Sequence, residues 1–227
     1  MTKRDLLLEI GMEEIPARYV VQSMEQLEEK VKQLLTQQSI GFGAVESFST
    51  PRRLAVLIKD VDEKQKDLKE EVRGPSKKVA LDAEGNWTKA AIGFTRGQGK
   101  TVDDIYFKEV KGVEYVFVEK FTPGKDTLEV LKQLKDLILS ITFPKQMRWG
   151  DLDIRYIRPI RWIVALFGDT VIPIDIANVS SSNETFGHRF LGEKITLNEP
   201  KEYKEKLLAK YVICDYHERR DAIFNQL

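Results

Sequence analysis

Runs of apolar residues that are only as long as a β-strand constrain this chain more than any other feature. Arg4–Ile10 reads RDLLLEI, and Trp162–Phe167 reads WIVALF. Nearly continuous apolar runs of this length are typical of strands that are buried on both faces of a sheet. Arg53–Val61 alternates between two largely apolar faces, as a half-covered or fully covered strand does. The sequence therefore predicts a sheet whose strands need cover from other elements.

Segments with helical spacing supply that cover. Helices are predicted from about residue 15 to residue 40, over 127–141 and over 199–210, because apolar residues recur there every three or four positions. Alternating segments on either side of Lys111-Gly112 predict a hairpin. Asn178–Glu193 is rich in Ser, Asn and Gly and is expected to be a loop. The predicted fold class is α+β, with mainly antiparallel sheets covered by helices.

The sequence also suggests how the chain divides. We expect residues 1–210 to form an amino-terminal α+β region with a small inserted subdomain near 62–125, which begins in a stretch rich in Lys, Glu and Asp. Residues 211–227 are expected to start a further helical region that is cut short. Asp215 is available there as a helix N-cap, and no glycine or proline follows to end the helix.

Composition excludes several classes of protein. The 227 residues carry 36 basic and 36 acidic side chains, so any attraction to a polyanion must come from local clustering. No apolar run approaches the roughly 18 residues that cross a bilayer, and acids interrupt the amino-terminal segment, so a cytoplasmic protein without membrane contact is expected. Cys214 is the only cysteine, and with two histidines the chain is not expected to hold a metal or a catalytic thiol.

One cluster of charge stands out. Residues 143–162 read FPKQMRWGDLDIRYIRPIRW, with five basic side chains, two acids and the rings of Trp149, Tyr156 and Trp162. Cations interleaved with rings suit a polyanion with stackable bases, because cations neutralise phosphates and rings accept base faces. The alternative is that the tryptophans belong to the core and that the arginines are solvated or paired with acids.

The candidate contacts to a polyanion or to a partner protein are mainly arginines, since the planar guanidinium donates paired hydrogen bonds to phosphate. Each also has a plain structural interpretation. Asp151 and Asp153 are available to pair with neighbouring arginines, His188 is able to stabilise its own glycine-rich loop, and the pair after Pro51 is suited to fixing the start of a strand. The candidates are Arg148, Arg155, Arg158, Arg161, His188 and Arg189, followed by Arg52 and Arg53.

Several ordered blocks resemble one family. They are FPKQMRWGD, IRPIRWIVALFGDTVIPI and SSNETFGHRFLG, together with LLLEIGMEEIPARYV, STPRRLAVLI, RGPSKKVALDAEGNWTKAAIGFTRGQG and VEYVFVEK. In this order they resemble the amino-terminal region of the beta subunit of bacterial glycyl-tRNA synthetase, the heterotetrameric (alpha2beta2) form of that enzyme. Members of that family are much longer than this chain and continue into helical and anticodon-binding regions, so we expect an amino-terminal fragment.

The resemblance implies a role without catalytic residues. In that family the alpha subunit forms the adenylate, so ATP and magnesium are expected there and no cofactor is expected on this chain. The implied partners are the alpha subunit and glycine-specific tRNA, and the implied fold is similar to the editing-type (B3/B4) domain of the phenylalanyl-tRNA synthetase beta subunit. Two alternatives remain: a purely structural module that docks the alpha subunit, and a hydrolase acting on mischarged tRNA, for which no positioned base or nucleophile stands out.

Overall fold

The computed structural model describes residues 2–227, which form two compact units. The first comprises residues up to Gln65 together with Lys125–Leu227, and the second comprises Lys66–Gly124. The second unit lies within the range 62–125 for which we predicted an inserted subdomain.

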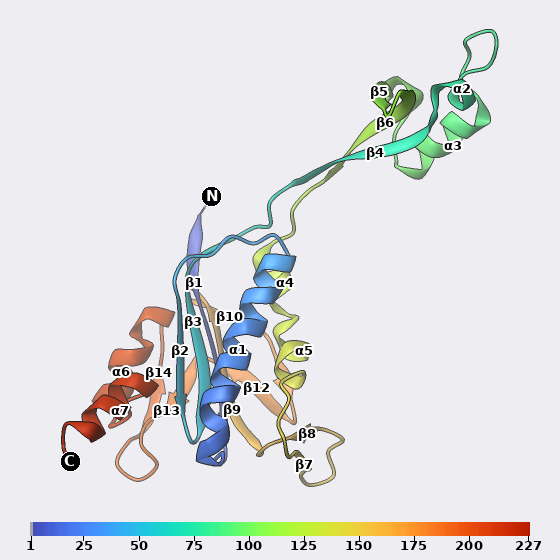
Figure 1. Ribbon diagram of the computed structural model, residues 1–227. Coiled ribbons are helices and arrows are strands. Elements are labelled where there is room, and N and C mark those ends of the chain that lie inside the picture. Colours follow the sequence, from blue (N-terminus) through green and yellow to red (C-terminus); the bar gives the residue numbers. More distant parts are fainter. Residues whose placement is uncertain (1) are drawn as a thin grey trace. The chain divides into compact units, whose positions relative to one another are not determined.

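A mixed seven-stranded sheet forms the centre of the first unit, with strand order β11-β12-β9-β1-β3-β2 and β10 pairing with β9 (Figure 1). All neighbouring strands are antiparallel except the parallel pair β12 and β9. The mainly antiparallel α+β class is therefore confirmed. The strands are β1 (Lys3–Met12), β2 (Val45–Thr50), β3 (Arg53–Asp62), β9 (Ile160–Phe167), β10 (Thr170–Val171), β11 (Asp175–Ile176) and β12 (Val179–Ser182).

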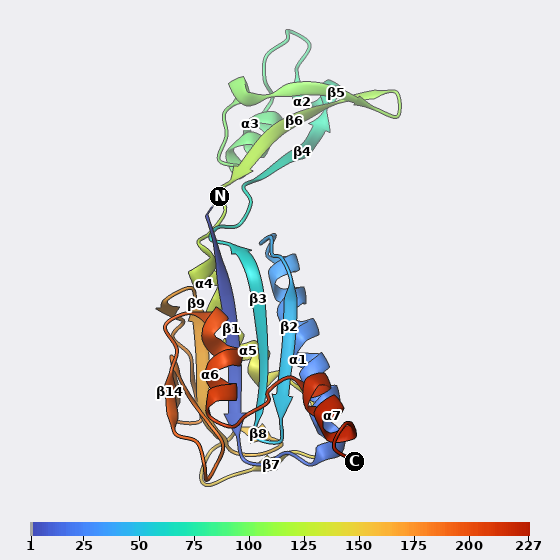
Figure 2. The same ribbon diagram turned by 90° about the vertical axis from the view of Figure 1, so that its left-hand side faces the viewer.

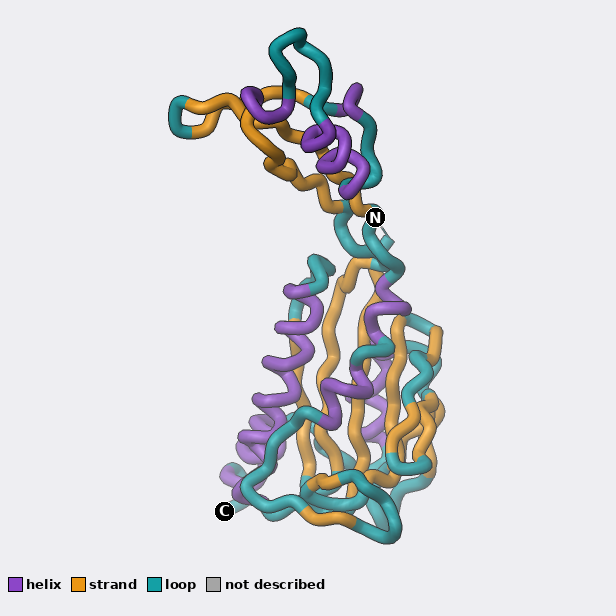
Figure 3. The backbone as a smooth tube through the Cα atoms, turned by 90° about the vertical axis from the view of Figure 1, so that its right-hand side faces the viewer, coloured by secondary structure: helices purple, strands orange, loops and turns teal. Residues whose placement is uncertain are grey.

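One face of this sheet is covered by the long helix α1 and by two short helices (Figure 3). Alternate residues of the central strands, such as Leu8, Val56 and Ala165, point to this face and are fully buried. The helices are α1 (Ala17–Gln37), α4 (Thr127–Leu131) and α5 (Leu134–Leu139). The single helix predicted over 127–141 is therefore wrong in detail, because a turn at Lys132–Gln133 divides it. Asp126 caps α4 by accepting a hydrogen bond from the backbone N–H of Leu128.

The opposite face packs against a second layer (Figure 2). The remaining alternate residues of the central strands lie here, including Leu7, Val164 and Leu166. Apolar runs in β1 and β9 thus serve two cores, as expected for strands buried on both faces. The second layer contains β13 (Glu184–Phe186) paired with β14 (Lys194–Thr196), the 3₁₀ turn η2 (Pro200–Glu202), α6 (Tyr203–Ala209) and α7 (Tyr216–Phe224).

One sequence expectation is corrected in this layer. The segment 178–193 is not one loop, because β12 and β13 form within it. The serines of β12 carry little strand signal, but Ser181 and Ser182 pair with the buried strand β9, which supplies the partner. Residues 211–227 group with the first compact unit, and Val212 and Cys214 are buried in its core. That this segment begins a further helical region stays a prediction. Asp215 does cap α7, as predicted.

The second unit is a three-stranded antiparallel sheet, β4-β6-β5, with two helices. Its hairpin turns at Lys111-Gly112, as predicted, and both residues have positive φ, 54° and 79°. Its elements are β4 (Leu68–Ser76), α2 (Lys77–Ala80), α3 (Lys89–Gly97), the 3₁₀ turn η1 (Val102–Asp104), β5 (Tyr106–Val110) and β6 (Val113–Thr122). In the first unit, β7 (Met147–Arg148) and β8 (Arg155–Tyr156) form a separate short pair.

Gly11 permits the close approach of β1 and β9. It lies opposite Trp162, and a Cβ atom at Gly11 would sit 1.9 Å from two atoms of the indole ring. Only glycine leaves room for the ring at this position. We predict that Gly11→Ala lowers the free energy of unfolding by about 3 kcal/mol, because overpacking a well-filled core forces its neighbours to move. Urea denaturation followed by circular dichroism measures this.

Gly93→Ala is the matched control. Nothing lies within 4 Å of a Cβ atom at this exposed position in α3. There the same chemical change is expected to stabilise its helix by about 0.5–1 kcal/mol. A Gly11→Ala variant as stable as the unmodified chain would contradict the packing of Trp162 on Gly11.

Candidate nucleic-acid interface

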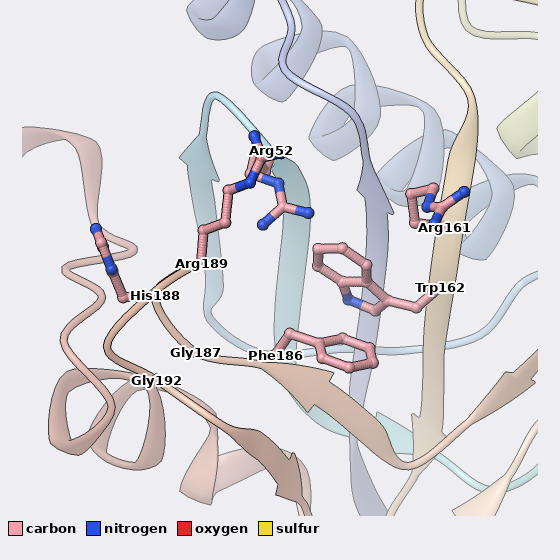
Figure 4. Close-up of a pocket in the computed structure, with 8 residues that line it drawn as sticks. All are labelled: Arg52, Arg161, Trp162, Phe186, Gly187, His188, Arg189 and Gly192. Atoms are coloured by element: carbon pink, nitrogen blue, oxygen red, sulfur yellow. The ribbon is translucent and has the colours of Figure 1, made fainter.

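An arginine-lined cavity of about 290 Å³ opens at the end of the central sheet where β1, β3 and β9 meet the second layer (Figure 4). We call it the arginine cavity. Arg52 comes from the turn between β2 and β3, Arg161 from β9, and His188 and Arg189 from the loop after β13. The structure thus brings four of the eight predicted residues together. The lining residues are Arg52, Arg161, Trp162, Phe186, Gly187, His188, Arg189 and Gly192.

Backbone hydrogen bonds fix the Gly187–Gly192 loop, GHRFLG. Gly192 N donates to the carbonyl of His188 (2.8 Å), and His188 N donates to the carbonyl of Lys210 (2.9 Å). A Cβ atom at Gly187 would lie 2.7 Å from the side chain of Lys210, and one at Gly192 would lie 2.4 Å from His188 N. Both glycines are therefore needed for the loop to dock against the end of α6.

His188 also stabilises this loop. Its Nδ1 accepts hydrogen bonds from the backbone N–H groups of Phe190 and Leu191, both at 3.3 Å. The plain structural interpretation of His188 therefore applies, since the ring folds back on its own loop. The loop presents the exposed side chains of Arg189, Phe190 and Leu191, which are 54%, 81% and 66% exposed.

A second cavity, of about 370 Å³, lies on the same loop. It shares Arg52, Gly187, His188 and Arg189 with the arginine cavity, and its other walls are more apolar. It is further lined by Glu14, Thr50, Pro51, Arg53, Phe190, Tyr211, Val212, Ile213 and Arg219.

A buried carboxylate holds together the strands that carry the cavity residues. Glu9 of β1 is fully buried, and its Oε1 accepts hydrogen bonds from Trp162 Nε1 and from the Thr185 hydroxyl (2.7 Å). Arg53, only 3% exposed, lies 3.8 Å from the same oxygen. Arg53 also donates to Thr185 Oγ1 (3.4 Å) and to the carbonyl of Phe186 (2.6 Å). Four strands, β1, β3, β9 and β13, thus meet at one charge pair directly before the Gly187–Gly192 loop.

Burial changes the expected role of Arg53. A side chain that is 3% exposed and bonded to Glu9, Thr185 and Phe186 does not reach an external phosphate. Its guanidinium instead lies 5.6 Å from the centroid of the Trp162 ring, and that of Arg52 lies 5.8 Å from it. Arg53 is therefore a positioning residue, whereas Arg52 is half-buried and lines both cavities.

The exposed arginines of the site pair with two acids. Arg161 Nε lies 3.3 Å from Glu13, and Arg189 Nη1 lies 3.4 Å from Glu14. Both acids precede α1, which begins at Ala17. Exposed ion pairs of this kind contribute about 0–1 kcal/mol, so they hold the two arginines only weakly.

The other three candidate arginines lie outside the arginine cavity. Arg148 of β7 faces Arg155 of β8, and Arg148 is paired with Asp153, as the plain interpretation anticipated. Arg155 is exposed and has no ion pair within residues 2–227. Arg158 donates to the backbone carbonyls of Glu14 (2.9 Å) and Ile157 (3.1 Å), so it braces the segment before α1.

The rings of the arginine-rich segment belong to the core. Tyr156 is fully buried and meets Phe143 edge to face, with ring centroids 4.8 Å apart. Trp162 is 6% exposed, and Trp149 is packed against the core. The plain interpretation therefore applies to Tyr156 and Trp162, whereas Trp149 is only partly buried against the core. The rings available at the site are Phe186, Phe190 and Tyr211.

Cys214 lies in the core of the second layer. Burial raises the pKa of its thiol to about 12, which opposes formation of the nucleophilic thiolate. Among residues 2–227, no group of three or more His, Cys, Asp or Glu side chains is placed to share a metal ion. In the same residues no helix is both long and apolar enough to span a membrane.

The comparisons with known proteins agree with the resemblance noted above. The family model described as glycyl-tRNA synthetase beta subunit matches residues 6–227. The chain belongs to this family. It is 57% identical over its whole length to the glycine-tRNA ligase beta subunits of Bacillus subtilis (strain 168) and Halalkalibacterium halodurans, and 47% identical over 99% of its length to that of Listeria monocytogenes serotype 4b. The chain spans only about a third of the length of these curated relatives, 33% in each case.

Some site residues were not predicted from the sequence. Tyr211 was not singled out, because an aromatic residue after an apolar helix carries no local sign of exposure. Glu9 was placed inside a buried strand without a partner. An acid within an apolar run, LLLEI, does signal a buried partner, since an isolated buried charge is costly.

The buried pair generates a stability prediction. Arg53→Met leaves the carboxylate of Glu9 buried without its cation and is expected to lower the free energy of unfolding by about 3–5 kcal/mol. The double variant Arg53→Met/Glu9→Gln removes the stranded charge but keeps an oxygen acceptor for Trp162 and Thr185. It is expected to recover most of the loss, leaving about 1–2 kcal/mol. Urea denaturation of Arg53→Met, of Glu9→Gln and of the double variant gives a complete double-mutant cycle. A double variant no more stable than Arg53→Met would refute the pairing of Glu9 with Arg53.

The raised pKa of Cys214 predicts its reactivity. At pH 8 the folded chain is expected to react with a disulfide reagent such as Ellman's reagent far more slowly than a free thiol, because the thiol is both buried and protonated. In urea one thiol per chain is expected to react at once. Rapid labelling of the folded chain would show that Cys214 is accessible.

Proposed function

We propose that this chain contributes tRNA contacts to glycyl-tRNA synthetase and so supports the ATP-dependent attachment of glycine to its tRNA. The observation that carries the proposal is the convergence of Arg52, Arg161 and Arg189 on one cavity beside exposed rings, in a chain of this family. Guanidinium groups bind phosphate through paired hydrogen bonds, and rings accept bases.

The charge of the site supports this role. Arg161 and Arg189 are more than half exposed and held only by surface ion pairs with Glu13 and Glu14. Arg52 adds a third cation, and its buried Nε has no hydrogen-bond partner within residues 2–227. Three arginines against two acids leave a local excess of positive charge on a chain whose total charge is zero. Local excess of this kind attracts a polyanion.

The partners, location and cofactors of the enzyme are proposed from the family to which the chain belongs. The partners are the alpha subunit and glycine-specific tRNA, in a heterotetramer in the cytoplasm. ATP and magnesium belong to the alpha subunit, and this chain acts as a non-catalytic part of the ligase. The similarity to the editing-type (B3/B4) domain of the phenylalanyl-tRNA synthetase beta subunit stays a proposal, supported by the antiparallel sheet with helices on both faces.

Subunit docking is the second candidate, and one observation favours it. Phe190 and Leu191 are 81% and 66% exposed at the tip of the Gly187–Gly192 loop, and exposed apolar side chains next to arginines are typical of interface centres. The affinity of an apolar docking surface depends weakly on salt concentration, whereas the affinity of phosphate contacts depends on it strongly.

Salt dependence tests the proposal. We predict that glycine-specific tRNA binds the chain more tightly than an unrelated tRNA and that log affinity falls linearly with log salt concentration. Arg161→Ala and Arg189→Ala are each expected to reduce that slope by nearly one, because each removes one phosphate contact. Fluorescence anisotropy of labelled tRNA at several salt concentrations measures both quantities. Arg155→Ala tests whether the contact surface extends to β8.

Lys135→Ala is the charge-matched control. Lys135 is exposed on α5, a helix that covers the opposite face of the sheet. Its removal is expected to leave both affinity and slope unchanged. If Arg161→Ala and Arg189→Ala behave like Lys135→Ala, the arginine cavity does not bind tRNA, and docking of the alpha subunit becomes the better assignment.

A further inference from the structure

Tyr211 occupies a backbone conformation that normally belongs to glycine. Its φ is 64°, in the left-handed region, directly after the end of α6. Val212 N donates to the carbonyl of Leu207 (2.9 Å), and Tyr211 N donates to the carbonyl of Leu208 (3.0 Å). These two bonds define the helix ending in which glycine is strongly favoured at the left-handed position.

The backbone therefore gives no reason for a tyrosine here. A side chain in the left-handed region costs free energy that glycine avoids, and such strain concentrates at binding sites. The ring of Tyr211 is 65% exposed, so it also gains little from burial in the core. It lines the second cavity. The ring is thus held at that cavity at the expense of stability.

Phe190 presents a second exposed ring to the same cavity. It is 81% exposed at the tip of the Gly187–Gly192 loop. The bond from His188 N to the carbonyl of Lys210 (2.9 Å) ties this loop to the residue before Tyr211. Lys210 Nζ lies 3.0 Å from Glu193, which strengthens the same junction. Both rings therefore project from segments that are locked to each other.

The second cavity shares a cationic wall with the arginine cavity. Arg52 and Arg189 line both. Arg219, which also borders the second cavity, is occupied by the carbonyl of Ile213 (2.7 Å). Arg189 is held at the cavity by its exposed ion pair with Glu14, which lines the same cavity, and its guanidinium lies 5.6 Å from the centroid of the Phe190 ring. Exposed rings beside guanidinium groups match the two parts of a nucleotide, because a base stacks on a ring and its phosphate pairs with arginine.

We propose that the second cavity holds one unpaired base of an RNA strand against Phe190 and Tyr211, while Arg52 and Arg189 bind the adjoining phosphate. This proposal rests on the proposed function and deepens it, since it names an unpaired nucleotide as the part of the RNA that enters the site. Unpaired bases are the parts of RNA that proteins stack on aromatic side chains. A cavity of about 370 Å³ falls in the size range of small-molecule sites.

Tyr211→Gly separates the binding role from a structural one. Removing the ring relieves the left-handed strain, so Tm is expected to rise by about 2 °C. Affinity for a short, fluorescein-labelled oligoadenosine is expected to fall about tenfold, as it should for Phe190→Ala, because each removes one stacking ring. Affinity for an abasic ribose-phosphate strand of the same length is expected to stay unchanged. Anisotropy and thermal unfolding give the two readouts.

Two controls complete the design. Tyr211→Phe keeps the ring and is expected to keep the affinity for oligoadenosine. Phe224→Ala removes a ring that is 68% exposed on α7 and lines neither cavity, and it is expected to change nothing.

Three outcomes overturn the proposal. Equal affinity of the unmodified chain for both strands, unaffected by the ring variants, would leave phosphate binding intact but refute the base site. A Tyr211→Gly variant with a lower Tm would assign the ring to the fold. Absence of salt-dependent binding of either strand would refute both this proposal and the tRNA contact from which it follows.

Discussion

The buried ion pair between Glu9 and Arg53 is the interaction on which the site depends. A carboxylate with no exposed surface is tolerated only when charge and hydrogen bonds compensate its lost hydration. Here Trp162, Thr185 and Arg53 do so from three different strands. Because Arg53 also holds the carbonyl of Phe186, the pair sets where β13 ends and where the Gly187–Gly192 loop begins. A neutral side chain at either position would not impose that geometry.

Two kinds of arginine follow from this arrangement. Arg53 stabilises the fold by donating to the carbonyl of Phe186. Arg158 stabilises the segment before α1 by donating to two backbone carbonyls. Arg161 and Arg189 remain at the surface, balanced by Glu13 and Glu14 across distances of 3.3 and 3.4 Å. Such exposed pairs contribute about 0–1 kcal/mol each, so they hold the side chains near the cavity only weakly. The Gly187–Gly192 loop, joined to Lys210 by a backbone hydrogen bond, carries Arg189 and Phe190.

The apolar pattern predicted much of this fold. The runs in β1 and β9 were interpreted as strands buried on both faces, and each supplies alternate residues to two cores. The hairpin at Lys111-Gly112 and the cap at Asp215 also followed from local chemistry. The rings of the arginine-rich segment did not follow, because charge density is a local property and burial is not. Tyr156 and Trp162 lie in the core although five cations surround them in the sequence.

The sequence by itself determined the α+β class, the family and the candidate arginines of the site, because periodicity, turn chemistry and ordered motifs are local. Only the tertiary structure decided which of the eight candidates meet. Arg52, Arg161, His188 and Arg189 lie up to 137 positions apart, between residues 52 and 189, yet line one cavity. Pairing of β1 with both β3 and β9 brings them together. The exposure of Tyr211 depends on a left-handed helix ending, which glycine favours and tyrosine does not.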